Sequence, residues 1–271
     1  MAIITKITTQ KKNSERFNIF LDYGKGEEYA FSVDQDVLLS FRLKKGMEID
    51  ELDITEIQFE DEVKKAFNLA LTFLSYRMRS KKEVIEYLKK KEIDEPIIPD
   101  VLHKLEEYKY INDEEFAKAY VQTQINTTSK GPEVLKQELY EKGIEKNSID
   151  QSLTLFSKEE QIETVTKLVE KALSKNAKIS EKQAKQKLEV ALQRKGYSWE
   201  VIQIALEEIQ FAKDVDEEWE AMEHHGFKAH RKYQHLEGWE YEQKMKQSLY
   251  RKGFAIEMIE KWIEQLKDGN N

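Results

Sequence analysis

Cysteine is absent from this chain of 271 residues, which excludes disulfide bonds, thiol nucleophiles and cysteine metal sites. Proline occurs three times and glycine ten times, so few residues interrupt helices or form the tight turns of an all-β protein. No apolar run approaches the ~20 residues that a helix needs to cross a bilayer, and the first residues lack the charged and apolar segments of a secretory signal. We therefore expect a helical protein of the cytoplasm that does not contact a membrane.

Motifs for catalysis and nucleotide binding are absent as well. The Gly24-Lys25 pair lacks the preceding glycine and the following hydroxyl residue of a phosphate-binding loop. The histidines near the C-terminus include no pair four residues apart, which is the spacing of a zinc site on a helix; they are His224, His225, His230 and His235. The acidic run from Glu51 to Glu62 fits the start of a helix, where carboxylates oppose the helix dipole. We predict no enzyme activity, no catalytic or metal-binding residues and no cofactor.

Charged residues are abundant and unevenly distributed. They make up 35% of the chain, against roughly 25% in an average globular protein, which suits long exposed helical surfaces. The net charge is −8, whereas a protein that binds bare DNA usually carries a basic excess. Residues 61–111 and 161–213 nevertheless sum to +1 and +3. Any contact with nucleic acid should therefore be local.

The first part of the sequence has the pattern of β-strands. Apolar and polar residues alternate in residues 17–23 and 29–33, and Gly24-Lys25-Gly26 between them is typical of a hairpin turn. With Ala2–Thr9 as a third strand, this region predicts a small antiparallel sheet. Asp34 is placed to cap a short helix after the last strand.

From about residue 61 the pattern is helical, and eight positions recur in four copies. The copies align on Leu88, Leu139, Leu192 and Leu249. An apolar residue stands four positions earlier, and a lysine stands three positions later, namely Lys91, Lys142, Lys195 and Lys252. In three copies the residue after the lysine is glycine, and in the first copy it is Glu92. The next residue is apolar in every copy. Further apolar residues stand five, nine and twelve positions after that apolar residue.

Each repeated position has a structural interpretation. The apolar pair lies on one face of a helix, the lysine falls in the last turn, and glycine allows the helix to end in the left-handed conformation. Because Glu92 replaces this glycine, the first copy is expected to end its helix in another way. The later apolar spacing predicts a second helix, and the 51 to 57 residues between copies leave room for a third.

The resulting prediction is a mainly α protein built from tandem three-helix repeats. Such repeats stack into an elongated, curved array, and here a small antiparallel β extension precedes them. The expected domains are the extension at 1–60 and four repeats at 61–111, 112–160, 161–213 and 214–271.

Three segments resemble the RecX family. Leu74-Ser75-Tyr76-Arg77-Met78-Arg79-Ser80, followed by Glu83 and Leu88, is similar to the first-repeat signature, and Tyr110 to Ala117 is similar to the opening of the second repeat. Gly131-Pro132, followed by Glu138 to Ile144, resembles the second-repeat helix and turn, and the β region resembles the extension of longer Gram-positive members.

This resemblance implies a non-enzymatic regulator without a cofactor. Its implied partners are the RecA recombinase and the RecA–DNA filament, with weak direct DNA binding. Inhibition of RecA in recombination, DNA repair and the SOS response is the implied outcome, and we expect a monomer. Two other functions remain open, namely a helical-repeat protein that binds DNA by itself and a metal-dependent nuclease.

Two sets of basic residues are candidate contacts. Arg77, Arg79, Lys81 and Lys82 form the densest basic cluster, which could bind DNA phosphate or an acidic protein surface. The alternative is a solvated helix end with Ser80 as its N-cap. The repeated lysines at 91, 142, 195 and 252 could line one edge of the stacked repeats, although their position at helix ends is already explained by the helix dipole.

Overall fold

A computed structural model of the chain describes residues 1–173, 179–209 and 215–268. The chain forms two compact units. Unit 1 comprises Met1–Ala117 and Tyr140–Ser148, and unit 2 comprises Lys118–Leu139 and Ile149–Asn271. The predicted domain boundary at residue 213 lies outside the described residues.

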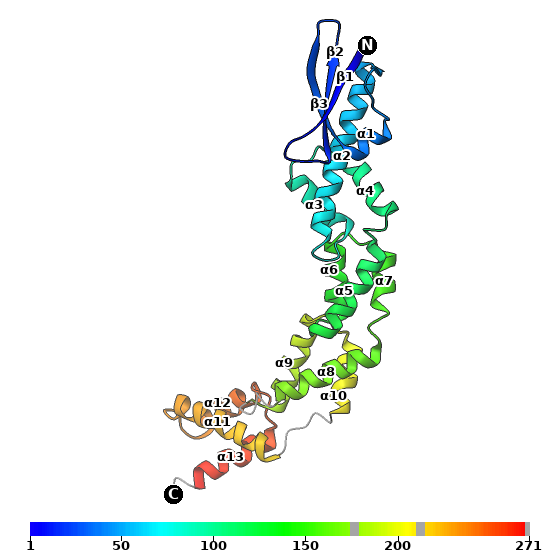
Figure 1. Cartoon of the computed structure of the whole chain (residues 1–271). Helices are drawn as coiled ribbons and strands as arrows, with labels where there is room; N and C mark the ends of the chain where they lie inside the picture. Colours follow the sequence, from blue (N-terminus) through cyan, green and yellow to red (C-terminus); the bar gives the residue numbers. More distant parts are fainter. Residues whose placement is uncertain (174–178, 210–214, 269–271) are drawn as a thin grey trace. The chain divides into compact units, whose positions relative to one another are not determined.

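Unit 1 begins with an antiparallel sheet in the order β3-β2-β1-β4 (Figure 1). Its strands are β1 (Ala2–Thr9), β2 (Arg16–Asp22), β3 (Glu27–Asp34) and β4 (Glu48–Ile49). The first three were expected, whereas the two-residue β4 is too short to leave an alternating pattern. Alternate apolar residues of β1, β2 and β3 face α1 (Gln35–Ser40) and α2 (Glu51–Leu74) and form one buried core with them.

Local side-chain contacts explain the turn and the short helix. One carboxylate oxygen of Asp22 accepts hydrogen bonds from the backbone N–H groups of Gly24, Lys25 and Gly26, at 2.7 to 3.1 Å. Both glycines have positive φ, which glycine adopts without steric cost. Asp34 caps α1 by accepting from the Asp36 N–H at 3.0 Å, as predicted.

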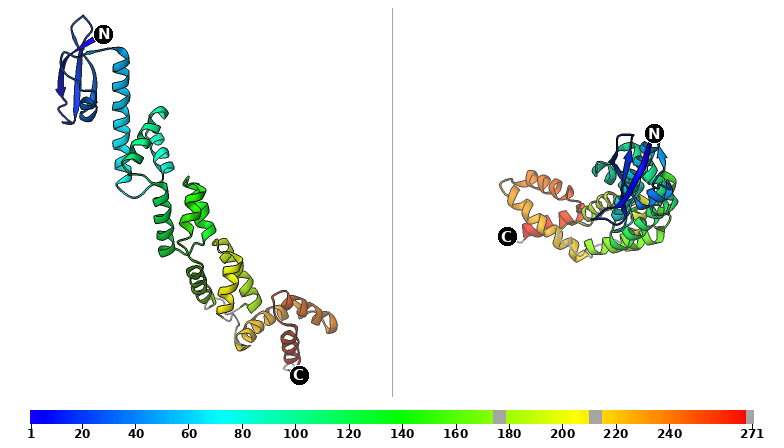
Figure 2. Two further views of the ribbon diagram at one scale, coloured as in Figure 1. Left: turned by 90° about the vertical axis from the view of Figure 1, so that its right-hand side faces the viewer. Right: turned by 45° about the horizontal axis from the view of Figure 1, so that its top comes forward.

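Helix α2 joins the sheet to the first repeat (Figure 2). It begins at Glu51 and ends at Leu74, so it runs through the expected boundary between the extension (1–60) and the first repeat (61–111). The buried Asp61 carboxylate on this helix pairs with the Arg16 guanidinium of β2 at 2.8 Å and accepts from the Asp34 N–H at 2.7 Å. Burial by itself raises the pKa of Asp61, but these hydrogen bonds and the nearby Lys65 ammonium outweigh it and hold the pKa below its ordinary value.

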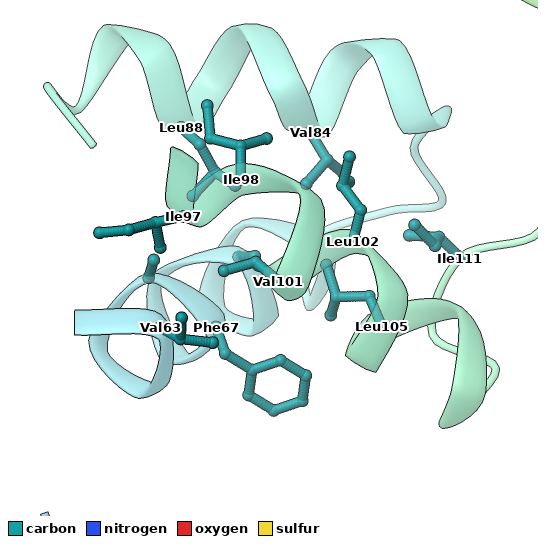
Figure 3. Close-up of a cluster of buried hydrophobic side chains, with 12 residues drawn as sticks. Val63, Phe67, Val84, Leu88, Ile97, Ile98, Val101, Leu102, Leu105 and Ile111 are labelled. Atoms are coloured by element: carbon teal, nitrogen blue, oxygen red, sulfur yellow. The ribbon is translucent and has the colours of Figure 1, made fainter. Parts of the chain in front are cut away.

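The first repeat packs α2 against α3 (Lys81–Lys90) and α4 (Ile98–Glu107), with a short 3-10 turn at Glu95–Ile97. Figure 3 shows Val84 and Leu88 of α3 lying over apolar residues of α4. Val63 and Phe67 of α2 complete this buried cluster from the other side.

The remaining described residues form three further groups of three helices, and in each group the first helix is the longest. The helices are α5 (Asp113–Thr127), α6 (Pro132–Glu141), α7 (Lys146–Leu153), α8 (Lys158–Leu173), α9 (Glu181–Arg194), α10 (Trp199–Glu208), α11 (Val215–Tyr233), α12 (Gly238–Tyr250) and α13 (Ile256–Asp268). All four aligned leucines are buried, with at most 2% of their surface exposed. The mainly helical, tandem-repeat fold class is thus confirmed.

The C-terminal end of the second helix in each repeat (α3, α6, α9 and α12) corrects the expectation about Glu92. Gly143, Gly196 and Gly253 have φ values of 79°, 90° and 90°, as a glycine at this position requires. Glu92, however, also adopts the left-handed conformation, with φ of 61°, and the Ile93 N–H closes the turn on the Leu88 carbonyl at 3.2 Å. The prediction that the first copy ends its helix differently is therefore wrong.

Candidate functional site

A hydrogen bond recurs between each repeat and the next, and three of the repeated lysines lie at these inter-repeat contacts. In each contact, a residue at the N-terminus of the second helix of one repeat (α3, α6 or α9) donates a hydrogen bond. The acceptor is the backbone carbonyl of the repeated lysine at the C-terminal end of the second helix of the next repeat (α6, α9 or α12). The pairs are Ser80 Oγ with Lys142 O at 2.8 Å, Gly131 N with Lys195 O at 2.6 Å, and Ser180 Oγ with Lys252 O. The first pair lies in unit 1 and the other two lie in unit 2.

The glycine position belongs to the same contact. A Cβ atom on Gly196 would lie 2.6 Å from the backbone nitrogen of Val134, and one on Gly253 would lie 2.7 Å from Ser180 Oγ. These distances are shorter than real Cβ contacts, so glycine is needed for close approach as well as for its positive φ. The first repeat has no repeat before it to dock at this position. Glu92 is accordingly exposed and tolerates a side chain.

The candidate residues Arg77 and Lys142 converge on Glu83 at the first inter-repeat contact. The Arg77 guanidinium binds Glu83 through both terminal nitrogens, at 2.8 and 3.3 Å, and donates to the Met78 carbonyl at 2.8 Å. Lys142 Nζ lies 3.5 Å from the same carboxylate, which also accepts from the Ser80 N–H at 3.1 Å. Burial by itself raises the pKa of Glu83, but the hydrogen bonds from Arg77 and the Ser80 N–H and the charges of Lys142 and Arg77 lower it overall. Arg77 is therefore held by an internal acid.

Arg79 is held in a different way, in an aromatic–cation stack that we define as Arg79, Phe73, Tyr87 and Lys91. The Arg79 guanidinium lies 4.2 Å from the centre of the Phe73 ring, and Phe73 stacks in parallel on Tyr87 at 4.0 Å. Lys91 Nζ lies 5.7 Å from the Tyr87 ring. The structure thus brings together two candidates, Arg79 and Lys91, that are twelve residues apart in sequence.

The electrostatic environment of Arg79 disfavours its charged form. Its Nε is buried without a hydrogen-bond partner, and burial together with the charge of Arg77 lowers the pKa of the guanidinium. A buried donor without an acceptor costs ~1–3 kcal/mol, and more when it is charged. The stack with Phe73 offsets ~0.5–2 kcal/mol of this cost. These two ranges overlap, so the stack with Phe73 can offset much of the cost of the unpaired Nε.

The two lysines of the basic cluster point to other partners. Lys81 Nζ pairs with Glu106 at 2.7 Å, and the Lys81 N–H donates to Asp113 at 2.8 Å. Lys82 Nζ donates to the Glu141 carbonyl at 2.8 Å, across the first inter-repeat contact. Ser80 caps α3 with Glu83 in a capping box, as the ordinary structural interpretation predicted. The cluster therefore divides into separately paired side chains.

The remaining candidates lie in unit 2. Lys195 Nζ donates to Ser129 Oγ at 2.7 Å, next to the second inter-repeat contact, and Lys252 is exposed. Sequence reasoning missed Phe73 and Tyr87, because residues with the periodicity of an ordinary helix carry no separate signal for a stack. Glu83 stands in the segment that resembles the first-repeat signature, but its role as a shared carboxylate was missed.

The described residues contain no group of three or more acidic or histidine side chains arranged to hold a metal ion. One of the four histidines noted in the sequence, His230, has an ordinary hydrogen-bond partner, because its Nδ1 lies 2.7 Å from the Tyr241 hydroxyl. Within the described part of the chain, no helix is both long and apolar enough to span a membrane.

Four family models match the chain, one of them twice. The model of the Regulatory protein RecX N-terminal domain matches residues 2–50. The first and second RecX three-helix domains match residues 66–105 and 112–153. The third RecX three-helix domain matches twice, at residues 159–206 and 216–263.

Individual relatives agree with these matches. Regulatory protein RecX of Bacillus subtilis (strain 168) is 54% identical over 265 residues, covering 98% of this chain and 99% of its own length. Regulatory protein RecX of Geobacillus sp. (strain WCH70) is 53% identical over 270 residues, covering 100% of this chain and 99% of its own. A crystal structure of regulatory protein RecX superposes with a TM-score of 0.69 at 38% identity, covering 76% of this chain and 100% of the other. The chain therefore belongs to the RecX family of regulatory proteins.

Proposed function

We propose that this chain binds the RecA recombinase and its filament on DNA, and thereby restrains RecA activity in recombination, DNA repair and the SOS response. Membership of the RecX family supports this proposal, because the sequence resemblance implies RecA as the partner. We further propose that the chain acts as a cytoplasmic monomer without catalysis or a cofactor.

The observation that carries the proposal is a local concentration of cations in an acidic protein. A protein that neutralises many phosphates of bare DNA gains affinity from counterion release, which a net charge of −8 opposes. Basic side chains at and just before the start of α3 provide local attraction instead, above all Arg79, which has no carboxylate partner among the described residues. The proposed contacts with the partner are Arg77, Arg79, Lys81, Lys82, Lys91, Lys142, Lys195 and Lys252.

Binding to a filament and to bare DNA separates this proposal from its alternatives. A fluorescently labelled single-stranded oligonucleotide is titrated with the protein, first alone and then coated with RecA and a non-hydrolysable ATP analogue. Tighter binding to the coated strand is expected. Equal affinity for both, with a steep salt dependence on the bare strand, would instead support a DNA-binding protein that acts by itself. Cleavage of the strand in the presence of Mg²⁺ would support the nuclease alternative.

A further inference from the structure

We infer that Arg79 is the anion contact of the loop between α2 and α3, and that it binds a phosphodiester group of single-stranded DNA. This inference rests on the proposed function and assigns one residue of the basic cluster to direct DNA contact. Toward the DNA, the other arginine, Arg77, then has a positioning role, and its contact with the partner protein is a separate proposal. The assignment follows from how the cluster is paired, how the loop is held and what surrounds the guanidinium.

Pairing separates Arg79 from its neighbours. Arg77 binds Glu83, and Lys81 binds Glu106. Lys82 donates to the Glu141 carbonyl and lies 3.9 Å from Glu86. Among these four cations, Arg79 is the one without a carboxylate or carbonyl partner in the described residues. An anionic ligand at this place would therefore pair with a guanidinium that forms no ion pair within the described residues, although the charge of Glu83 acts on it.

The position of Arg79 is fixed before any ligand arrives. Its guanidinium lies 4.2 Å from the centre of the Phe73 ring, and the parallel stack with Tyr87 holds that ring in place. The preceding loop is fixed as well, because Arg77 donates to the Met78 carbonyl while bound to Glu83. An arginine held in this way loses little conformational freedom on binding, and its planar fork matches the two oxygens of a phosphate.

The surroundings favour single-stranded nucleic acid over an acidic protein surface. Tyr76 is 80% exposed and Met78 is 50% exposed, and both lie in the loop that holds Arg79. Proteins that bind single strands combine exposed aromatic rings, on which unpaired bases stack, with cations that contact the backbone, and this loop carries both kinds of residue. A carboxylate on a protein would also fit the arginine fork, but it would leave the exposed Tyr76 without a role.

The test compares single substitutions on the full-length protein. Arg79→Ala removes the charge and the stack, whereas Arg79→Lys keeps the charge and removes the planar fork. Lys89→Ala is the charge-matched control, because Lys89 lies in the last turn of α3, away from the loop that holds Arg79, and pairs with the exposed Glu95. Binding is measured to the bare oligonucleotide over a salt series, to RecA without DNA, and to the RecA-coated strand. Circular dichroism melting confirms that each variant is folded.

The expected result is specific to DNA. Arg79→Ala should weaken binding to the bare strand about tenfold and reduce the dependence of log K on log salt by about one phosphate contact. Arg79→Lys should restore the salt dependence but not the full affinity, and Lys89→Ala should bind as the wild type does. Unchanged binding by folded Arg79→Ala would overturn the inference. A loss confined to RecA without DNA would also overturn it and point to a protein carboxylate.

The proposed function fails separately from this inference. If the wild-type protein binds the bare strand through Arg79 but binds the RecA-coated strand no better, then the DNA contact is supported and the RecA proposal is contradicted. If the wild type prefers the coated strand and Arg79→Ala keeps full affinity for the bare strand, the reverse holds.

Discussion

Replacing Gly196 by alanine tests whether the inter-repeat contacts hold neighbouring repeats together. Gly196 has a φ of 90°, and an added Cβ would lie 2.6 Å from the Val134 nitrogen and 2.9 Å from Val134 Cγ2. One of these atoms belongs to the backbone, so the contact cannot be relieved by rotating a side chain. The contact also includes the hydrogen bond from Gly131 N to the Lys195 carbonyl, which a shift of the helix would lengthen.

The magnitude follows from two terms. A left-handed conformation costs an L-residue ~1–2 kcal/mol, and overpacking a close contact costs a further ~1–3 kcal/mol. Gly196→Ala should therefore lower the free energy of unfolding by ~2–5 kcal/mol. Gly238→Ala is the matched control in the same unit, because Gly238 also has positive φ but an added Cβ would meet nothing within 4 Å. This control should lose at most ~1–2 kcal/mol.

The assay is urea unfolding followed by tryptophan fluorescence. All four tryptophans, at positions 199, 219, 239 and 262, lie in unit 2 with both glycines, so the signal reports on that unit. A clearly larger midpoint shift for Gly196→Ala than for Gly238→Ala is expected. Equal shifts would refute the reasoning, because they would show that backbone strain alone explains the glycine and that the repeats do not press against it.

Other substitutions test the buried faces, the sheet anchor and the first helix end. Leu192→Ala should cost ~2–5 kcal/mol because it leaves a cavity, whereas Lys195→Ala should cost at most ~1 kcal/mol; equal urea midpoints would mean that the buried face of α9 is misassigned. Asp61→Ala should destabilise unit 1 by ~3–5 kcal/mol, because it removes the carboxylate partner of the largely buried Arg16 guanidinium and leaves it only the hydrogen bond to the Ser32 carbonyl. Since the pKa of Asp61 is lowered in the folded state, the wild-type advantage should be present above the ordinary pKa and disappear as the pH falls through the lowered one; an advantage that persists in acid would contradict this. Glu92→Gly should raise the melting temperature, with a gain of ~1 kcal/mol from relief of left-handed strain, and a lower melting temperature would count against that strain.

The fold was largely predictable because it is repeated. Four copies of the same apolar spacing at Leu88, Leu139, Leu192 and Leu249 indicate which helix faces are buried, and each copy supports the others. The N-terminal hairpin was predictable because alternation and glycine coincide there. Strand β4 was not, because its two residues give no alternating signal and owe their pairing to the strand beside them.

The candidate site was less predictable than the fold. Sequence spacing grouped Arg77 with Arg79, but it does not show which side chain an internal acid will bind. Glu83 forms an ion pair with Arg77, and the Phe73 ring contacts the Arg79 guanidinium. Both contacts form because the fold brings the end of α2 beside the start of α3. The Glu92 position was misjudged for a related reason. The need for glycine comes from the neighbouring repeat that docks on it, and the first copy has none.

The most direct test of the account is the growth of RecA filaments on single-stranded DNA, followed in real time with and without this protein. The account predicts that substoichiometric amounts of the wild-type chain slow or halt filament extension, and that Arg79→Ala does so less effectively at the same concentration. Filament growth that is unchanged at saturating protein, under conditions where RecA is active and the chain is folded, would contradict the central claim that this RecX protein acts on the RecA filament.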